Sequence, residues 1–222
     1  MSDILVIAPH ADDESLGCGG TLLRYKNEGH KLHWLIVTGM SEEAGFTQER
    51  IEQRDKEIKK VADLFGFSSL TQLYLPPAAL ETIPIGRIIG EISGAIKNIQ
   101  PEVVYVPYRN DAHSDHQIVF DAAMSATKSF RYPFIKRVLA YETISETDFG
   151  MKPEDGGFRP NVFIDISQYL QNKLNILDVY EYEMGQFPFP RSRKALEALA
   201  TLRGVQSNAH AAEAFMLIKE IL

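Results

Sequence analysis

Short apolar runs alternate with stretches of helical periodicity over the first 130 residues of the chain. Four runs have the length and the β-branched content of strands that are buried on both faces. They cover residues 3–8, 33–38, 71–75 and 102–106. Helical patterns cover residues 16–28, 48–65 and 85–99, and the last has isoleucines at the spacing of a core-facing stripe. This alternation predicts right-handed βαβ crossovers and therefore a parallel sheet.

The pattern loosens beyond residue 130. Two further runs have strand character and are expected at or near the edge of the sheet: 137–142 and 161–166. Helical patterns return at 168–184 and 193–203. The polar loop 145–160, rich in Gly and Pro, is long enough to be functional, and loop 185–192 is a second expected pocket loop. No repeat or boundary interrupts the chain, so we expect one α/β domain over residues 1–222. Its fold is predicted to be a Rossmann-like, mostly parallel sheet with helices on both faces.

Composition narrows the class of protein. Of the 222 residues, 45% are hydrophobic and 24% are charged, close to the average for soluble globular domains. The 23 basic and 30 acidic residues give a formal net charge of −7, which disfavours nucleic-acid binding. The single cysteine, Cys18, favours a reducing compartment, and Asp3 stands where a secretory signal needs positive charge. We therefore expect a cytoplasmic protein without a membrane span, and leave a homo-oligomer open.

Residues with acid–base and metal-binding chemistry follow the first and the fourth predicted strands. They are His10, Asp12, Asp13 and Glu14 in the first loop, and Asp111, His113, Asp115 and His116 in the second. In an open parallel sheet, ligands bind outside the carboxyl ends of the strands. Both loops leave the sheet at that edge, so we expect them to face one crevice.

A zinc site of hydrolytic type commonly takes two histidines and one carboxylate and leaves one position open for water. His10, Asp13 and His116 supply such a set. A nearby base must accept the proton of that water, and Asp12, adjacent to a ligand but pointing elsewhere, suits this role. The sequence therefore predicts a metal site with its own general base.

The histidine that remains in the second loop suits the opposite role. His113, if it is not a ligand, would stand beside the metal as an imidazolium that stabilises an oxyanion and protonates a leaving amine. Asp115 could hold that ring in its charged form. Ser114 and Gln117 fit a capping box, which predicts that a helix begins there.

Each motif also has a plain structural interpretation. Carboxylates after a strand often only begin a helix, where the helix dipole favours them. A His-x-x-His pair is also found on exposed helix faces. The occurrence of both motifs at equivalent ends of two strands favours a metal site over these separate explanations.

APHADDE followed by LGCGGTL, with HSDH about a hundred residues later, resembles the LmbE/PIG-L family of zinc-dependent N-acetylglucosaminyl deacetylases. The resemblance includes RDKEIKKVADLFG, with Arg54 twelve residues before Gly66, and RGVQSNAHAAEAF near the C-terminus. Nearly the whole chain is covered. Asn208 and Ala211 stand where the family often has glycine and tyrosine, beside His210, so the substrate stays open.

The resemblance implies a role for each site residue. It implies that His10, Asp13 and His116 bind Zn²⁺, or another divalent metal such as Fe²⁺. It implies that Asp12 is the general base and that His113, paired with Asp115, stabilises the oxyanion as an acid. Arg54 would help to hold the substrate.

Three functions therefore compete. The first is a metal-dependent deacetylase acting on a small N-acetylated amino sugar or glycoconjugate. The second is a non-catalytic carbohydrate-binding relative, although a binder has no need of Asp12. The third is a nucleotide-dependent enzyme of Rossmann type, suggested only by the sheet and by LGCGG at residues 16–20, which lacks the full dinucleotide motif. Metal analysis and acetate release discriminate among them.

Overall fold

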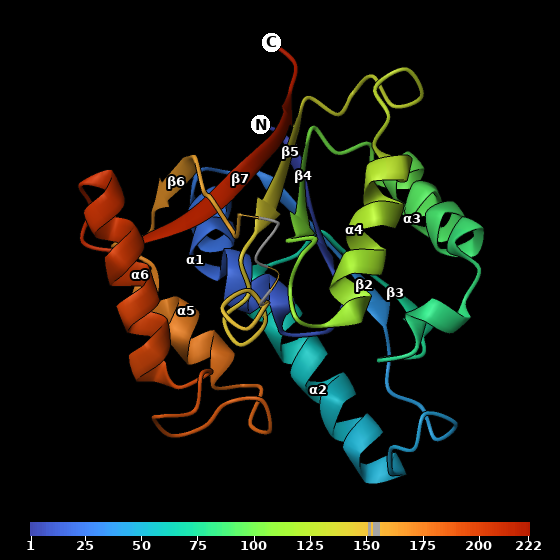
Figure 1. Ribbon diagram of the computed structural model, residues 1–222, viewed down its shortest axis with the longest axis horizontal. Coiled ribbons are helices and arrows are strands. Elements are labelled where there is room, and N and C mark those ends of the chain that lie inside the picture. Colours follow the sequence, from blue (N-terminus) through green and yellow to red (C-terminus); the bar gives the residue numbers. More distant parts are fainter. Residues whose placement is uncertain (151, 153–155) are drawn as a thin grey trace.

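Seven strands form one sheet in the computed structural model, which describes residues 1–150, 152 and 156–222 (Figure 1). The strands are β1 (Asp3–Ala8), β2 (Lys31–Thr38), β3 (Ser69–Leu75), β4 (Val103–Pro107), β5 (Arg137–Tyr141), β6 (Val162–Asp165) and β7 (Ala212–Glu220). Their order across the sheet is β3-β2-β1-β4-β5-β7-β6. Strands β1 to β5 are parallel to one another, whereas β7 is antiparallel to both β5 and β6. The predicted single α/β domain with a mostly parallel sheet is confirmed.

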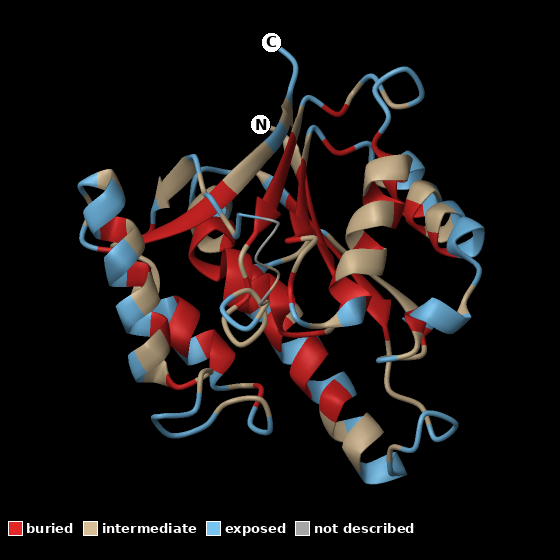
Figure 2. Cartoon of the chain, viewed as in Figure 1, coloured by how far each residue is buried: buried red, intermediate tan, exposed pale blue. Residues whose placement is uncertain are grey.

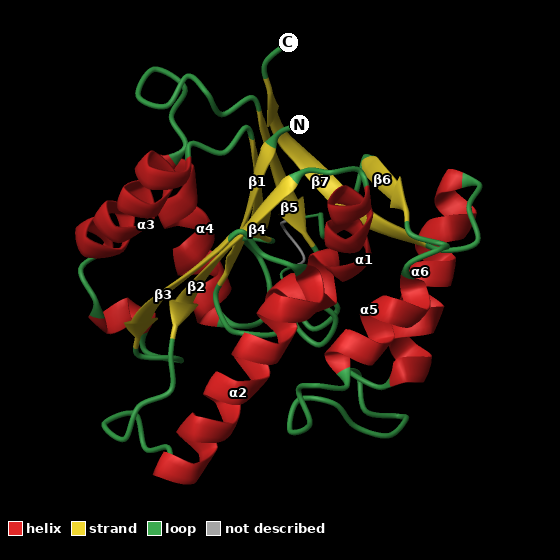
Figure 3. Ribbon diagram, turned by 180° about the vertical axis from the view of Figure 1, so that it is seen from behind, coloured by secondary structure: helices red, strands yellow, loops and turns green. Residues whose placement is uncertain are grey.

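Six α-helices cover the two faces of the sheet in the described part of the chain (Figure 3). They are α1 (Asp13–Asn27), α2 (Gln48–Phe65), α3 (Ile85–Ile99), α4 (Ser114–Ala126), α5 (Leu170–Leu177) and α6 (Arg193–Ser207). Apolar residues of α3 and α4 join one core cluster with one face of the strands, and those of α1, α2, α5 and α6 join the cluster on the other face. The parallel strands between the two helix layers are therefore almost wholly buried (Figure 2). None of these helices is long and apolar enough to cross a bilayer.

The position of β1 determines where the functional loops meet. It pairs with β2 on one side and with β4 on the other. The chain leaves β1 toward β2 and β3 and later returns to β4, so the strand order reverses between β1 and β4. A crevice opens at the carboxyl ends of strands at such a switch point. The expectation that the two loops leave the sheet side by side is confirmed.

Some predicted boundaries are wrong. The first helix begins at Asp13 rather than at residue 16. The predicted helix 168–184 is shorter, because after α5 the chain turns and brings Tyr180 and Glu183 to other parts of the molecule. Strand β7 was not expected; it pairs between β5 and β6, so β6 is the edge strand and β5 lies two strands in from that edge. Residues 151 and 153–155 of the predicted pocket loop 145–160 lie outside the described residues.

The glycines of LGCGG lie inside α1 and allow close packing. A Cβ added to Gly20 would lie 2.7 Å from side-chain atoms of Ile166, and one added to Gly17 would meet the ring of Tyr141. Both glycines are buried. These residues therefore do not form a phosphate-binding loop ahead of a helix, which removes the main support for the nucleotide-dependent alternative.

A buried ion pair joins α1, α5 and β7. The Lys173 ammonium donates to Glu213 Oε1 at 2.6 Å and to the carbonyl oxygen of Leu16 at 2.7 Å. The Glu213 carboxylate also accepts the backbone N–H groups of Gly20 and Thr21, at 2.8 and 2.7 Å. Because its charges and polar groups have partners, the pair fixes the C-terminal strand against the helix that carries Asp13.

Replacing Glu213 with alanine is expected to lower the free energy of unfolding by about 3–5 kcal/mol, since the Lys173 ammonium would stay buried without its partner. Replacing both residues, as Lys173→Met with Glu213→Leu, should cost less because no unpaired charge remains. Urea denaturation of the two variants measures the difference. A double variant less stable than the single one would contradict this account of the pair.

Candidate metal centre and active site

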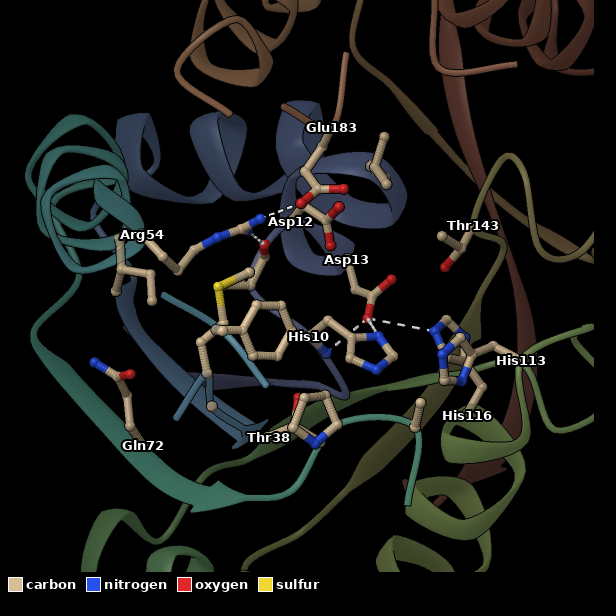
Figure 4. Close-up of a pocket in the computed structure, with 18 of the residues that line it drawn as sticks. His10, Asp12, Asp13, Thr38, Arg54, Gln72, His113, His116, Thr143 and Glu183 are labelled. Atoms are coloured by element: carbon tan, nitrogen blue, oxygen red, sulfur yellow. Dashed lines mark hydrogen bonds and ion pairs between the residues drawn. The ribbon is translucent and has the colours of Figure 1, made fainter. Parts of the chain in front are cut away.

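The loops after β1 and β4 form the floor of a cavity of about 300 Å³ (Figure 4). His10 and Asp12 come from the first loop, and Asp13 is the first residue of α1. His113 and His116 come from the second loop and the first turn of α4. The structure thus brings all five residues to one cavity, as their positions at the ends of two neighbouring parallel strands predict.

His10, Asp13 and His116 converge on one point. Asp13 Oδ2 lies 3.4 Å from His10 Nδ1 and 3.4 Å from His116 Nε2. The three donor atoms all lie within 4.8 Å of one another. In a tetrahedral zinc site with bonds of about 2.0–2.2 Å, neighbouring ligand atoms are about 3.3–3.6 Å apart. The spacing and chemistry of this donor set therefore fit a zinc ion.

Each of these histidines has a carboxylate on its other ring nitrogen. Asp115 Oδ2 lies 3.0 Å from His10 Nε2, and Asp111 Oδ2 lies 2.7 Å from His116 Nδ1. A histidine that binds a metal commonly donates its second N–H to such a carboxylate, which sets the tautomer and the ring orientation. Sequence reasoning placed Asp111 in the loop but gave it no role. The sequence feature that could have identified Asp111 is its place as an acidic residue between the end of the fourth predicted strand and His113.

Asp115 contacts His10 rather than His113, the partner that the sequence predicted. Its carboxylate Oδ2 is 3.9 Å from His113 Nδ1, beyond hydrogen-bonding distance. It instead accepts hydrogen bonds from His10 and from the backbone N–H of Ala78, the latter at 2.8 Å. His113 Nδ1 accepts the N–H of Asp115 at 3.1 Å, so His113 caps α4 and the predicted Ser114 capping box does not form.

A second donor group can be compared with the first. His10, His113 and Asp115 also lie close enough to hold a metal. Two of its atoms already bond each other, because Asp115 Oδ2 lies 3.0 Å from His10 Nε2. In the first group the inward-facing atoms are separated by the spacing that a metal requires. The geometry therefore favours Asp13 and His116 as the partners of His10.

Burial and neighbouring charges shift the pKa values of the site residues. Burial lowers the pKa of His10, but hydrogen bonds with Asp115 and Asp13 outweigh it and raise the pKa to about 9. Burial alone would raise the pKa of Asp13, but His116 and His10 hold it well below its usual range. Burial and the charge of His10 lower the pKa of His113. Since a metal requires neutral imidazoles, its binding must displace protons from this site.

Asp12 occupies the cap position of α1, but its side chain makes no capping hydrogen bond. Its backbone has φ of 150°, a conformation that favours glycine and is often retained at functional sites. The side chain is buried and lines the cavity. Burial, together with the charges of Asp13 and Glu183, raises the pKa of Asp12 well above its usual range. The carboxyl group therefore lines the cavity with its charged form disfavoured.

Arg54 lies in the cavity wall and is held by three parts of the chain. It is buried on α2 and donates to the carbonyl oxygen of Ala11 and to the carboxylate of Glu183. Its Nε also lies 3.2 Å from Glu57 Oε2. Arg54 is therefore a buried residue of the cavity wall and not an exposed arginine paired only along its own helix. Glu183, from the turn after α5, is a cavity residue that sequence reasoning missed.

Comparisons with known proteins agree with the site. The PIG-L family model, described as GlcNAc-PI de-N-acetylase, matches residues 5–127. A probable N-acetyl-alpha-D-glucosaminyl L-malate deacetylase 2 of Bacillus anthracis is 25% identical, over 80% of this chain and 79% of that protein. A diacetylchitobiose deacetylase of Thermococcus kodakarensis is 25% identical, over 100% of this chain and 85% of that protein. The crystal structure of a conserved protein from Thermus thermophilus superposes with a TM-score of 0.78 at 27% identity, over 100% of this chain and 97% of that one. Since the family model matches more than half of the sequence, this chain belongs to the PIG-L family.

Proposed function

We propose that this protein is a zinc-dependent deacetylase that hydrolyses the N-acetyl group of an amino sugar or of its conjugate. The observation that carries the proposal is the set of His10, Asp13 and His116, each histidine backed by a carboxylate. The names of the two relatives support the reaction class, because each name describes a deacetylase of an N-acetylated sugar compound.

His10, Asp13 and His116 would hold the metal, as Zn²⁺ or as another divalent ion such as Fe²⁺. When bound, the ion lowers the pKa of water and polarises the acetyl carbonyl. Hydrolysis then adds hydroxide to the acetyl carbon and a proton to the nitrogen as the C–N bond breaks.

Two side chains are proposed to move the proton. Asp12 accepts it from the attacking water, since its carboxyl group lines the cavity and makes no hydrogen bond to another described residue. His113 delivers a proton to the leaving nitrogen and stabilises the oxyanion, and its ring centroid lies 4.5 Å from that of His10. Asp115 acts mainly on His10, which it orients. Arg54 is proposed to contact substrate hydroxyl groups with N–H groups that the protein does not use.

Acetate release from N-acetylated sugars tests the proposal. Treatment with a chelator is expected to abolish release, and one equivalent of zinc should restore it. The assay should include N-acetylglucosamine, N,N′-diacetylchitobiose and N-acetylglucosaminyl malate, with elemental analysis of every preparation. Turnover that persists in protein shown to be metal-free would exclude a metal-dependent mechanism. A zinc-loaded, folded protein that binds sugars without releasing acetate would instead support the carbohydrate-binding alternative.

A further inference from the structure

The cavity wall beside Asp12 contains two arginines that share one carboxylate, that of Glu183. Arg54 donates to Glu183 Oε1, and Arg191 Nη2 lies 3.3 Å from Glu183 Oε2. Arg191 Nε also donates to the backbone oxygen of Glu183 at 2.7 Å. Figure 4 shows Glu183 beside both Asp12 and the guanidinium group of Arg54. Within the described part of the chain, Glu183 thus pairs with both arginines that line the cavity, and also with Arg50 outside it at 3.5 Å.

The other guanidinium nitrogens also contact the protein. Arg54 Nη1 donates to the Ala11 carbonyl, and Arg54 Nε faces Glu57. Arg191 Nη1 donates to Ser145 Oγ at 3.2 Å. Arginine binds a carboxylate or a phosphate most strongly when two of its N–H groups form a free fork toward the ligand. Every guanidinium nitrogen of the two arginines therefore already faces an acceptor of the protein, which leaves single N–H groups of the terminal nitrogens but no free fork for a ligand.

The charged residues that line the cavity also disfavour an anionic ligand. Among the described residues that line it, five have carboxyl groups and two have guanidinium groups, and lysine does not occur. They are Asp12, Asp13, Asp55, Glu146, Glu183, Arg54 and Arg191. With His10 and His116 neutral as metal ligands, a divalent cation would offset two of the three carboxyl groups in excess over the guanidinium groups, which leaves an excess of one. An anionic substituent in the cavity would therefore meet charges of its own sign, which disfavours binding.

The rest of the wall suits an uncharged ring. Its larger apolar side chains include Met40, Phe46, Ile58 and Tyr74. Tyr74 is exposed, and its backbone has φ of 52°, a conformation uncommon for a residue other than glycine. The apolar face of a pyranose ring can pack on such side chains, while its hydroxyl groups donate to the carboxylates.

We propose that this site accepts uncharged N-acetylated sugars and disfavours conjugates with a carboxylate or phosphate beside the sugar, with Glu183 as the specificity-determining residue. This proposal rests on the proposed deacetylase function and names its substrate class. Glu183 acts by holding Arg54 and Arg191 away from anionic groups and by adding its own negative charge.

Two glycosides with the same α-linkage test this proposal. They are methyl N-acetyl-α-D-glucosaminide, which is neutral, and N-acetyl-α-D-glucosaminyl L-malate, which has two carboxylates. In the zinc-loaded protein, kcat/KM should be at least about tenfold higher for the neutral glycoside. Glu183→Gln should reduce this ratio by about tenfold, mainly through a lower KM for the malate conjugate, because it frees arginine donors and removes a negative charge.

Glu181→Gln is the matched control. Glu181 is an exposed residue of the same turn and does not line the cavity, so the same change of charge there should leave the ratio unaltered. A wild-type preference for the malate conjugate would overturn the proposal. An unchanged ratio in folded Glu183→Gln protein would overturn the role of Glu183.

Direct binding separates this proposal from the proposed function. Calorimetric titration of both glycosides into the zinc-loaded proteins, with and without Glu183→Gln, needs no turnover. If neither glycoside releases acetate, the deacetylase function fails on these compounds, and tighter binding of the neutral glycoside still supports the charge preference. Equal or tighter binding of the malate conjugate to the wild-type protein contradicts it.

Discussion

Replacing Asp12 with asparagine is expected to lower kcat by about 10²–10⁴ while the protein keeps its zinc, since loss of a general base typically has an effect of this size. The substitution preserves the size of the side chain and removes only its ability to accept a proton. Asp12 does not contribute an atom to the His10, Asp13 and His116 donor group, so zinc content should stay at one equivalent. Steady-state kinetics and elemental analysis of one preparation measure both quantities.

The alternative role of Asp12 as a helix cap makes a different prediction. Loss of a cap would lower stability by about 1 kcal/mol and leave kcat nearly intact. The side chain of Asp12 makes no capping hydrogen bond, and its φ of 150° favours glycine. Asp12→Gly is therefore expected to raise Tm, by relief of about 1–3 kcal/mol of backbone strain, and still to abolish activity. Near-normal kcat in a folded, zinc-loaded Asp12→Asn protein would show that the base is another residue.

Replacing Asp13 with alanine is expected to weaken zinc binding by more than about 100-fold, because even the residues that only orient a ligand are worth 10–100-fold in metal affinity. Asp13 Oδ2 faces both His10 and His116 at 3.4 Å and also accepts the backbone N–H of His10 at 2.9 Å. Its loss removes one donor and releases the loop that holds another. Activity should return in part at high zinc concentration.

Two matched variants locate the metal within the histidine cluster. Asp111→Asn keeps an acceptor for His116 but removes its charge, and should weaken zinc binding by about 10–100-fold. His113→Ala should keep stoichiometric zinc and lose kcat. Competition with a chelator of known affinity measures all three dissociation constants. If His113→Ala loses zinc while Asp13→Ala keeps it, the metal is held by the alternative group of His10, His113 and Asp115.

Local pattern was enough to predict the parallel sheet and the place of the site. Strands β1, β2 and β4 are apolar runs buried on both faces of the sheet. Such runs can be recognised in the sequence without knowing which strands they pair with. Parallel strands end at one edge, so two loops that follow β1 and β4 had to lie near each other once both strands were assigned. His10, Asp13 and His116 could be grouped for this reason, before any distance was known.

Contacts between distant parts of the chain were decided only by the tertiary structure. Strand β7 begins with alanine and glutamate, which favour helices, and becomes a strand because it pairs between β5 and β6. Asp115 contacts His10. Glu183 contacts Arg54 from a turn that the local sequence pattern predicted to be part of a helix. Two factors decide which group contacts which: how close the fold brings the two groups, and whether a buried charge needs an opposite charge beside it. Neither factor can be recognised in a short stretch of sequence. The sequence by itself therefore determined which chemical groups the site contains, whereas the tertiary structure decided which of these groups contact each other.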